Sequence, residues 1–158
     1  MPEISVLLNN FNYGEFVGEA IQSVLSQDFK DFELILVDDG STDGSRTEIE
    51  RWKDSRIRKI FQKNGGQLSA IHAGFQISRG RILCFLDSDD LYSPGYLAAV
   101  ARCFRNNADC GFLLAEMEYF GTKKGRMPFP FPEGRLGGRA FSVAVLHQWF
   151  GVPTSGCS

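Results

Sequence analysis

The sequence predicts an α/β fold in which helices flank a mainly parallel sheet. Short apolar runs rich in β-branched residues alternate along the chain with segments whose apolar residues recur at helical spacing. This alternation is typical of parallel strands joined by right-handed helical crossovers. The run Ile82–Leu86 is apolar throughout and leads directly into the acidic stretch Asp87–Asp90, a pattern that indicates a strand buried on both faces.

Each predicted strand is a short apolar run that ends at polar or turn-forming residues. The first ends at Asn9, the second at Asp38 and the fourth at Asp87. The third is followed by Gly65–Gly66, a pair that permits a positive φ or a close approach of the backbone to a ligand. The predicted strands cover residues 4–8, 32–37, 57–61, 82–86 and 110–117.

Helical signals follow each of the first four predicted strands. Asn12, with Glu15 three residues later, has the pattern of a helix amino-terminal cap. Pro94 is typical of a first helical position, and Asp90 or Ser93 could cap that helix. Apolar residues at helical spacing then form the face that packs on the sheet. The predicted helices cover residues 16–25, 43–52, 68–77, 94–106 and 141–150.

Length and composition indicate one globular domain or a large part of one. The chain has 158 residues, of which 43% are hydrophobic and 23% charged, with a net charge of -2. This charge gives no general attraction to nucleic acid. We expect residues 1–120 to form an α/β ligand-binding region. We expect residues 121–158 to form a loop and a helix that lead into a missing part of the same domain.

The cysteines and the start of the chain favour a reduced compartment. The four cysteines lack the close spacing of a metal site; they are Cys84, Cys103, Cys110 and Cys157. The start Met1–Glu3 lacks the basic and apolar leader of a signal peptide. No apolar run approaches the ~20 residues that a membrane helix needs. We therefore expect a cytoplasmic protein without a transmembrane segment, or one bound peripherally at the cytoplasmic face of the membrane.

Two predicted strands end in acids, at Asp38–Asp39 and at Asp87–Asp89. The carboxyl ends of parallel strands meet at one edge of a sheet, so both sets can line one cleft. Carboxylates that leave one strand together repel one another, and a hard divalent metal carrying phosphates would relieve that repulsion. The first pair suits a neutral donor such as a ribose hydroxyl or a base N–H. The structural alternative is that these residues only form turns and caps.

Few other side chains suggest chemistry. Phe11 follows the first predicted strand at the same edge, where its ring could stack on a base or pack in the core. His72 and His147 fall within predicted helices and are interpreted as ordinary helical residues. No Ser/His/Asp or Cys/His order indicates a nucleophilic triad in this sequence. No residue is therefore assigned as a nucleophile.

Five motifs occur in the order and spacing seen in family 2 glycosyltransferases. Each motif is weak alone, whereas five in sequence are specific. The chain resembles the family closely from position 4 to about 106 and loosely after that. The motifs lie at residues 5–12, 22–27, 33–43, 64–66 and 85–90.

The resemblance implies a GT-A, Rossmann-like fold that binds a nucleotide-diphosphate sugar donor and transfers the sugar, usually by an inverting single displacement. It implies that Phe11 stacks on the base, where the family commonly has Tyr. Asp39 would accept the base N–H, with Asp38 supporting the loop. The implied substrate-binding residues are Asn9, Phe11, Asp38, Asp39, Asn64, Gly65 and Asp87.

The resemblance also implies a Mn²⁺ or Mg²⁺ site. Asp87 and Asp89 stand at the positions of the family's D-x-D motif. Asp89 would bind the metal that bridges the diphosphate, and Asp87 would reach the ribose or a metal-bound water. A metal in this place stabilises negative charge on the leaving nucleoside diphosphate.

The chain departs from the family in two respects. Asn9–Asn10 stand where many members have Pro-Thr, which leaves the base of the donor open. Members supply the general base from a later acidic motif, and nothing matching it follows Ser155, so we expect the base beyond Ser158. The acceptor side is expected to be missing as well. We therefore expect this chain to bind donor without transferring sugar to its acceptor, which could be a saccharide, a lipid or a protein.

Other classes of protein share parts of this pattern. A phosphoacceptor receiver domain carries its acid pair after its first strand, whereas Ile4–Leu8 precedes Asp38–Asp39 here. A haloacid-dehalogenase phosphatase has its acidic motif on the first strand and a Thr or Val where this chain has Leu91. A sugar nucleotidyltransferase has a glycine-rich first loop, which is absent after Leu8. A non-catalytic module that binds nucleotide sugars remains an alternative.

Overall fold

The computed structural model describes residues 1–115, 117–121 and 124–126. The chain divides into two compact units, Met1–Gly111 and Phe112–Ser158. The helix predicted at residues 141–150 and most of the loop before it lie outside the described residues. The boundary expected at residue 120 therefore stays a prediction.

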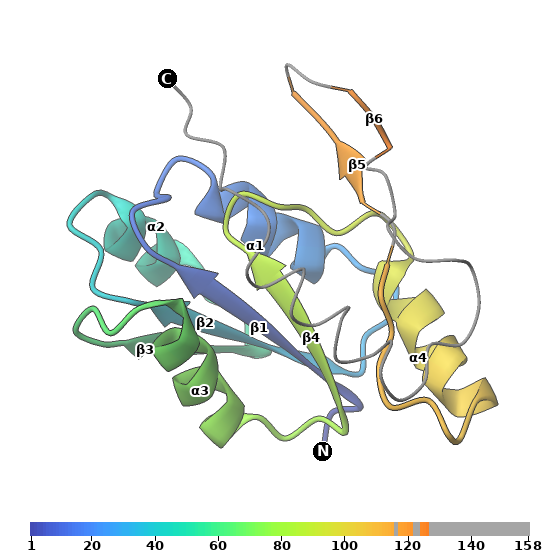
Figure 1. Ribbon diagram of the computed structural model, residues 1–158. Helices are drawn as coiled ribbons and strands as arrows, with labels where there is room; N and C mark the ends of the chain where they lie inside the picture. The colour runs from blue at the N-terminus through green and yellow to red at the C-terminus, as the bar shows by residue number, and fades with distance from the viewer. Residues whose placement is uncertain (116, 122–123, 127–158) are drawn as a thin grey trace. The chain divides into compact units, whose positions relative to one another are not determined.

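The first unit contains a four-stranded parallel sheet flanked by helices (Figure 1), as the sequence predicts. Its strand order is β3-β2-β1-β4, and each register pairs parallel neighbours. The strands are β1 (Ile4–Asn10), β2 (Phe32–Asp38), β3 (Ile57–Phe61) and β4 (Ile82–Asp87). The helices are α1 (Val17–Leu25), α2 (Ser45–Arg51), α3 (Gln67–Ile77) and α4 (Tyr96–Asn106).

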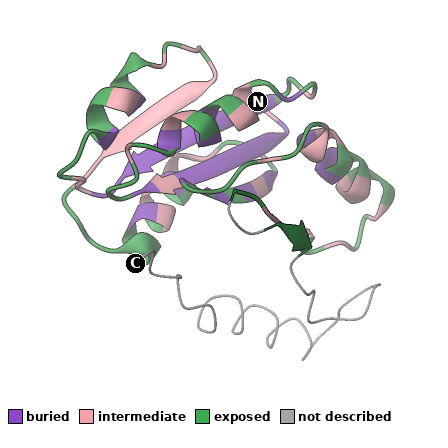
Figure 2. Cartoon of the chain, turned by 90° about the horizontal axis from the view of Figure 1, so that it is seen from above, coloured by how far each residue is buried: buried purple, intermediate pink, exposed green. Residues whose placement is uncertain are grey.

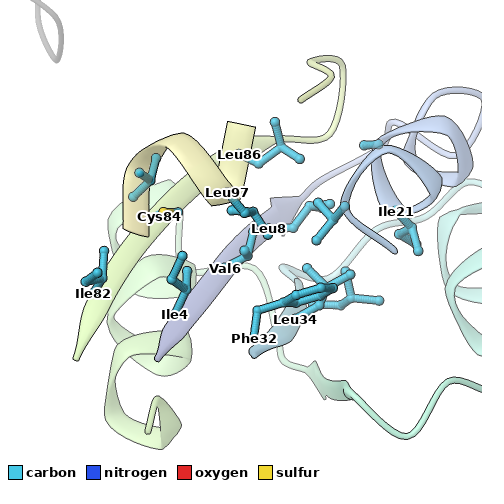
Figure 3. Close-up of a cluster of buried hydrophobic side chains, with 14 of the residues drawn as sticks. Ile4, Val6, Leu8, Ile21, Phe32, Leu34, Ile82, Cys84, Leu86 and Leu97 are labelled. Atoms are coloured by element: carbon cyan, nitrogen blue, oxygen red, sulfur yellow. The ribbon is translucent and has the colours of Figure 1, made fainter. Parts of the chain in front are cut away.

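Alternate residues of the inner strands β1 and β2 face two different helical layers. One face packs in a large apolar cluster with α1, α2 and α4, and Figure 3 shows Ile21 and Leu97 meeting side chains of β1, β2 and β4. The other face carries a smaller cluster in which Ile35 and Val37 contact Ala70 of α3. Figure 2 shows the inner strands buried and β3 only partly covered. Full burial of one such aliphatic side chain stabilises the fold by ~1.5–3 kcal/mol.

β4 differs from its prediction as a strand buried on both faces. Ile82, Cys84 and Leu86 are buried, whereas Leu83 is half-buried and Phe85 is 51% exposed. β4 lies at one end of the strand order, and α3 packs over β1 and β2 rather than over β4. The length and composition of an apolar run do not indicate whether a helix covers its second face.

The predicted fifth strand is also wrong. No strand occurs in the described residues 110–115. The described residues of the second unit instead include two short strands, β5 (Glu118–Tyr119) and β6 (Gly125–Arg126), which pair antiparallel. The apolar stretch before β5 resembles a strand in composition, but composition does not supply a partner with which its backbone can pair.

Two predicted helix caps do not form. Asn12 has a φ of 59° and lies before α1, which begins at Val17. Its Oδ1 accepts the backbone N–H of Thr42 at 2.8 Å, so it ties two loops together. α4 begins at Tyr96 after Gly95, and no side chain caps it. Asp90 and Ser93 are therefore not its caps, because Gly95 turns the chain with a φ of 79° first.

Candidate functional site

The carboxyl end of β1 carries two amide side chains that contact the acids of both neighbouring strands. In the sheet register Asn9 lies beside Asp87, and Asn10 lies beside Asp38. Asn9 Nδ2 donates to Asp87 Oδ1 at 3.1 Å, and Asn10 Nδ2 donates to Asp38 Oδ1 at 2.8 Å. Since successive side chains of a strand point in opposite directions, one dipeptide serves both acidic ends.

Asp38 is buried and holds the turn that follows β2. Its carboxylate accepts the Ser41 hydroxyl at 2.5 Å and the Ser41 backbone N–H at 3.2 Å. Ser41 Oγ in turn accepts the backbone N–H of Asn12 at 2.9 Å. The Asp38 carboxylate therefore ties the turn after β2 to the end of β1 through Asn10 and Ser41.

Asp39 is 3% exposed and joins the end of β2 to the loop before α3. Its Oδ1 accepts Gln62 Nε2 at 2.6 Å and the N–H of Gly65 at 2.9 Å, and its Oδ2 accepts the N–H of Gly66 at 2.8 Å. These donors are neutral. A carboxylate has about four lone-pair positions, so these three donors leave one acceptor position of Asp39 unused.

Gly40→Ala is expected to lower the stability of this corner. Gly40 has a φ of 76°, and a Cβ there would lie 2.6 Å from the backbone nitrogen of Asn64. The left-handed conformation alone costs a non-glycine residue ~1–2 kcal/mol, and the contact with a fixed backbone atom adds to that. Thermal unfolding measures the loss. Gly44→Ala is the matched control because a Cβ at Gly44 meets nothing within 4 Å, and an equal loss there would contradict the prediction.

Asp87 is held on one side only. Asn9 Nδ2 and Gln67 Nε2 both donate to its Oδ1 at 3.1 Å. Oδ2 makes no hydrogen bond or ion pair with the described part of the chain, and neither does Asp89. Neutral amide donors orient a carboxylate without cancelling its charge. The site thus presents Asp87 Oδ2 and the exposed Asp89 without a cationic partner among the described residues.

The acidic stretch carries charge that no basic side chain of the described residues neutralises. Asp90, although exposed as a residue, has a partly desolvated carboxyl group, and this desolvation together with the charges of Asp89 and Asp87 raises its pKa to about 6. Its backbone N–H donates to the carbonyl of Asp87 at 3.1 Å, which folds the stretch back on itself. A bound cation would relieve the mutual repulsion of these acids.

The residues fit a metal that arrives with phosphates rather than one caged by protein. Among residues 1–115, 117–121 and 124–126, no group of three or more His, Cys, Asp or Glu side chains could hold a metal ion. Asp87 and Asp89 together offer two carboxylates. Mg²⁺ commonly binds through one or two carboxylates plus water and substrate phosphates. The donor set therefore suits a cation shared with a diphosphate.

The remaining predicted site residues lie around this array. Phe11 follows β1 at the same edge, and the residue is 43% exposed. Asn64 is exposed at the turn beside Gly40. The contacts also reveal residues that the sequence prediction omitted. These are Asn10, Ser41, Gln62 and Gln67, all of which donate to a site carboxylate. Only Ser41 has a signal in the sequence, because it follows the acidic end of β2, whereas Asn10, Gln62 and Gln67 belong to other parts of the chain.

A parallel sheet whose β1, β2 and β4 end in this acidic and amide array defines a GT-A, Rossmann-like domain. Solved structures agree. Residues 1–349 of TarS from S. aureus match with a TM-score of 0.62 and 26% identity, over 67% of this chain and 33% of that one. The mannosyltransferase PcManGT from Pyrobaculum calidifontis has the same fold, with a TM-score of 0.61 and 22% identity over 65% of this chain and 32% of that one.

The chain belongs to glycosyl transferase family 2, whose sequence model matches residues 5–146. An uncharacterized glycosyltransferase of Nostoc sp. is 40% identical over 114 residues, 70% of this chain and 35% of the relative. The putative teichuronic acid biosynthesis glycosyltransferase TuaG of Bacillus subtilis is 35% identical over 114 residues, 70% of this chain and 45% of the relative. The chain therefore spans less than half the length of these curated relatives.

Membership of this family excludes the receiver domain, the phosphatase and the nucleotidyltransferase as alternatives. The family match includes all five sequence motifs, from residue 5 to residue 146. Within the described residues, no helix is long and apolar enough to span a bilayer.

Proposed function

We propose that this chain binds a nucleotide-diphosphate sugar at the carboxyl edge of its sheet, in a protein that transfers the sugar with inversion and depends on Mn²⁺ or Mg²⁺. One observation carries the proposal. Asp87 is oriented through Oδ1 by two amides, while Oδ2 and the neighbouring Asp89 keep their charge and lack partners among the described residues. TarS has been solved with UDP-GlcNAc, and PcManGT with GDP-Man and Mn²⁺. These complexes show what other proteins of this fold bind.

Different residues of the acidic stretch would bind different parts of the donor and its metal. Asp89 would hold the metal, and Asp87 would take the ribose or a metal-bound water, with Asn9 and Gln67 fixing its orientation. The bound metal would supply Lewis-acid stabilisation of the leaving diphosphate. Asn9 and Gln67 thus act on the donor through Asp87.

The base of the donor would lie on the β2 side of the edge. Asp39 has one acceptor position left for a base N–H. The exposed ring of Phe11 offers a face for stacking. Asn64 and Gly65 would border the base, because the Gly65 N–H is held by Asp39. A cytoplasmic location, or one at the cytoplasmic face of the membrane, stays a prediction.

A thermal-shift panel tests the proposal. UDP-, GDP- and TDP-sugars are added to the chain with Mn²⁺, with Mg²⁺ or with EDTA. A ligand that binds only the folded form stabilises it by about 2.7 kcal/mol at a hundredfold excess over its Kd. We expect a shift with one base and a metal, and none in EDTA. Equal shifts with and without metal would contradict the metal assignment, and no shift with any donor would contradict donor binding.

Asp39→Ala is expected to weaken nucleoside binding and to leave the response to metal intact. Loss of one buried hydrogen bond costs ~1–3 kcal/mol, which is about 5- to 150-fold in Kd. Titration calorimetry of UDP and GDP with and without Mn²⁺ measures both quantities.

The same substitution frees the N–H groups of Gly65 and Gly66, so a control has to separate loop loosening from a lost base contact. Gln62→Met provides it, because it removes one donor to Asp39 and keeps the carboxylate. We expect Gln62→Met to retain most of the affinity. If Asp39→Ala lost its response to Mn²⁺ but kept nucleoside affinity, the two acidic ends would have to exchange roles.

A further inference from the structure

The acidic stretch leads into a loop, residues 88–95, that runs to α4 and is fixed mainly by contacts outside the stretch itself. Asp87, Asp89 and Asp90 make no ion pair within the described residues, so no described side chain of opposite charge holds them in place. Their mutual repulsion favours a more open loop. The position of the loop therefore depends on neutral hydrogen bonds, and these come from α1 and from two strands.

Gln27, just after α1, provides the most complete of these anchors. Its side chain is 2% exposed. Its Nε2 donates to the carbonyl of Ser93 at 2.9 Å, and its Oε1 accepts the N–H of Leu97 in the first turn of α4 at 3.1 Å. Nε2 also donates to the carbonyl of Ser23 at 3.1 Å. Both ends of one amide are thus satisfied, and they join α1 to the loop and to α4.

Ser23 adds a second anchor one turn earlier. Its Oγ accepts the backbone N–H of Tyr92 at 3.1 Å and donates to the carbonyl of Ala20 at 2.8 Å. The other attachments run to the strands. Ser88 Oγ donates to the carbonyl of Asn9 at 2.6 Å, and the Tyr92 hydroxyl donates to the carbonyl of Phe85 at 2.8 Å. Hydrogen bonds therefore hold the loop from two directions. Ser23 of α1 and Gln27 provide one set, and the carbonyl groups of β1 and β4 provide the other.

We propose that Gln27, assisted by Ser23, is a positioning residue for the acidic stretch. By holding Ser93 and Leu97, Gln27 fixes the far end of the loop, and Asp87–Asp90 then keep the spacing that a metal-bound diphosphate requires. This inference rests on the proposed function. Groups that orient metal ligands without touching the metal typically change metal affinity by ~10–100-fold when removed.

The test compares Gln27→Ala with Val24→Ala in the 158-residue chain. Val24 is fully buried on α1, just before Gln27 in the chain, and its side chain makes no hydrogen bond with the loop, so its truncation lowers stability without removing the anchor. Three quantities are measured: the Kd of UDP and GDP with Mn²⁺, the Kd of Mn²⁺ alone, and amide hydrogen exchange across residues 88–97 without ligand.

For Gln27→Ala we expect metal-dependent nucleotide binding to weaken about tenfold or more and residues 88–97 to exchange faster. For Val24→Ala we expect a lower melting temperature, with the Kd of the folded protein within about twofold of the wild type. An unchanged Kd in Gln27→Ala, or an equal loss in Val24→Ala, would overturn the inference. Failure of the wild-type chain to bind UDP or GDP with Mn²⁺ would instead contradict the proposed function.

Ser23 supplies a second pair of variants in case Gln27→Ala does not fold. Ser23→Ala removes the acceptor for the Tyr92 N–H, whereas Ser23→Thr keeps a hydroxyl that can still bond the preceding turn of the helix. We expect Ser23→Ala to weaken Mn²⁺-dependent binding several-fold and Ser23→Thr to restore it. Equal affinity of the two variants would overturn the role of the hydroxyl, because only Ser23→Thr retains one.

Discussion

Asp89→Ala is expected to abolish the metal dependence of nucleotide binding together with most of the affinity. Asp89 is exposed and has no partner among the described residues, so its charge is available to a cation. Removing groups that only orient a metal ligand costs ~10–100-fold, so loss of the ligand itself should cost more than about 100-fold. Titration of UDP and GDP in Mn²⁺ and in EDTA measures both effects, and the mutant values should coincide.

The control for this substitution is Asp109→Ala, an exposed acid after α4 that changes the net charge equally. Its nucleotide affinity should match the wild type in both conditions. A general electrostatic effect would instead weaken repulsion of the diphosphate in both variants and raise the affinity in EDTA. If Asp89→Ala retained a full response to Mn²⁺, Asp87 would have to be the principal ligand.

The strands and their acidic ends were predictable because each depends on local sequence. An apolar run such as Phe32–Val37 fits only the interior of a sheet, and the acids that follow it cannot be buried there without partners. The predicted starts and ends of the first four strands therefore fall within two residues of those observed. The parallel arrangement follows from the intervening helices.

The contacts within the site were not predictable in the same way. Gln67 donates a hydrogen bond to Asp87 across the edge of the sheet. The spacing of these two residues in the sequence does not predict this contact. Asn12 has the residue type of a helix cap, yet its side chain bonds Thr42 of another loop. Side chains of Asn can serve either purpose, and only the packing of the two loops decides between them. The hydrogen bonds of Gln27 with Ser93 and Leu97 were likewise not predictable from local sequence.

Sugar transfer by the 158-residue chain is expected to be ~10²–10⁴-fold slower than by a longer form that extends past Ser158, although both bind donor. That factor is the usual contribution of a general base. An inverting transfer needs a carboxylate on the acceptor side of the donor. Asp87 and Asp89 are assigned to the leaving group, and Asp38 and Asp39 are buried with protein donors.

The other acids of the chain do not mark a base. Glu118 is exposed on β5 and pairs with Arg126 at 3.6 Å, and Glu116 and Glu133 lie outside the described residues. The Nostoc relative is about three times as long as the matched region, which leaves ample sequence for an acceptor-side carboxylate. Transfer rates are measured with labelled donor and with saccharide, lipid and peptide acceptors, at donor concentrations that saturate both forms. Equal rates would place the base within residues 1–158, and Glu116, Glu118 and Glu133 would be the first to replace by glutamine.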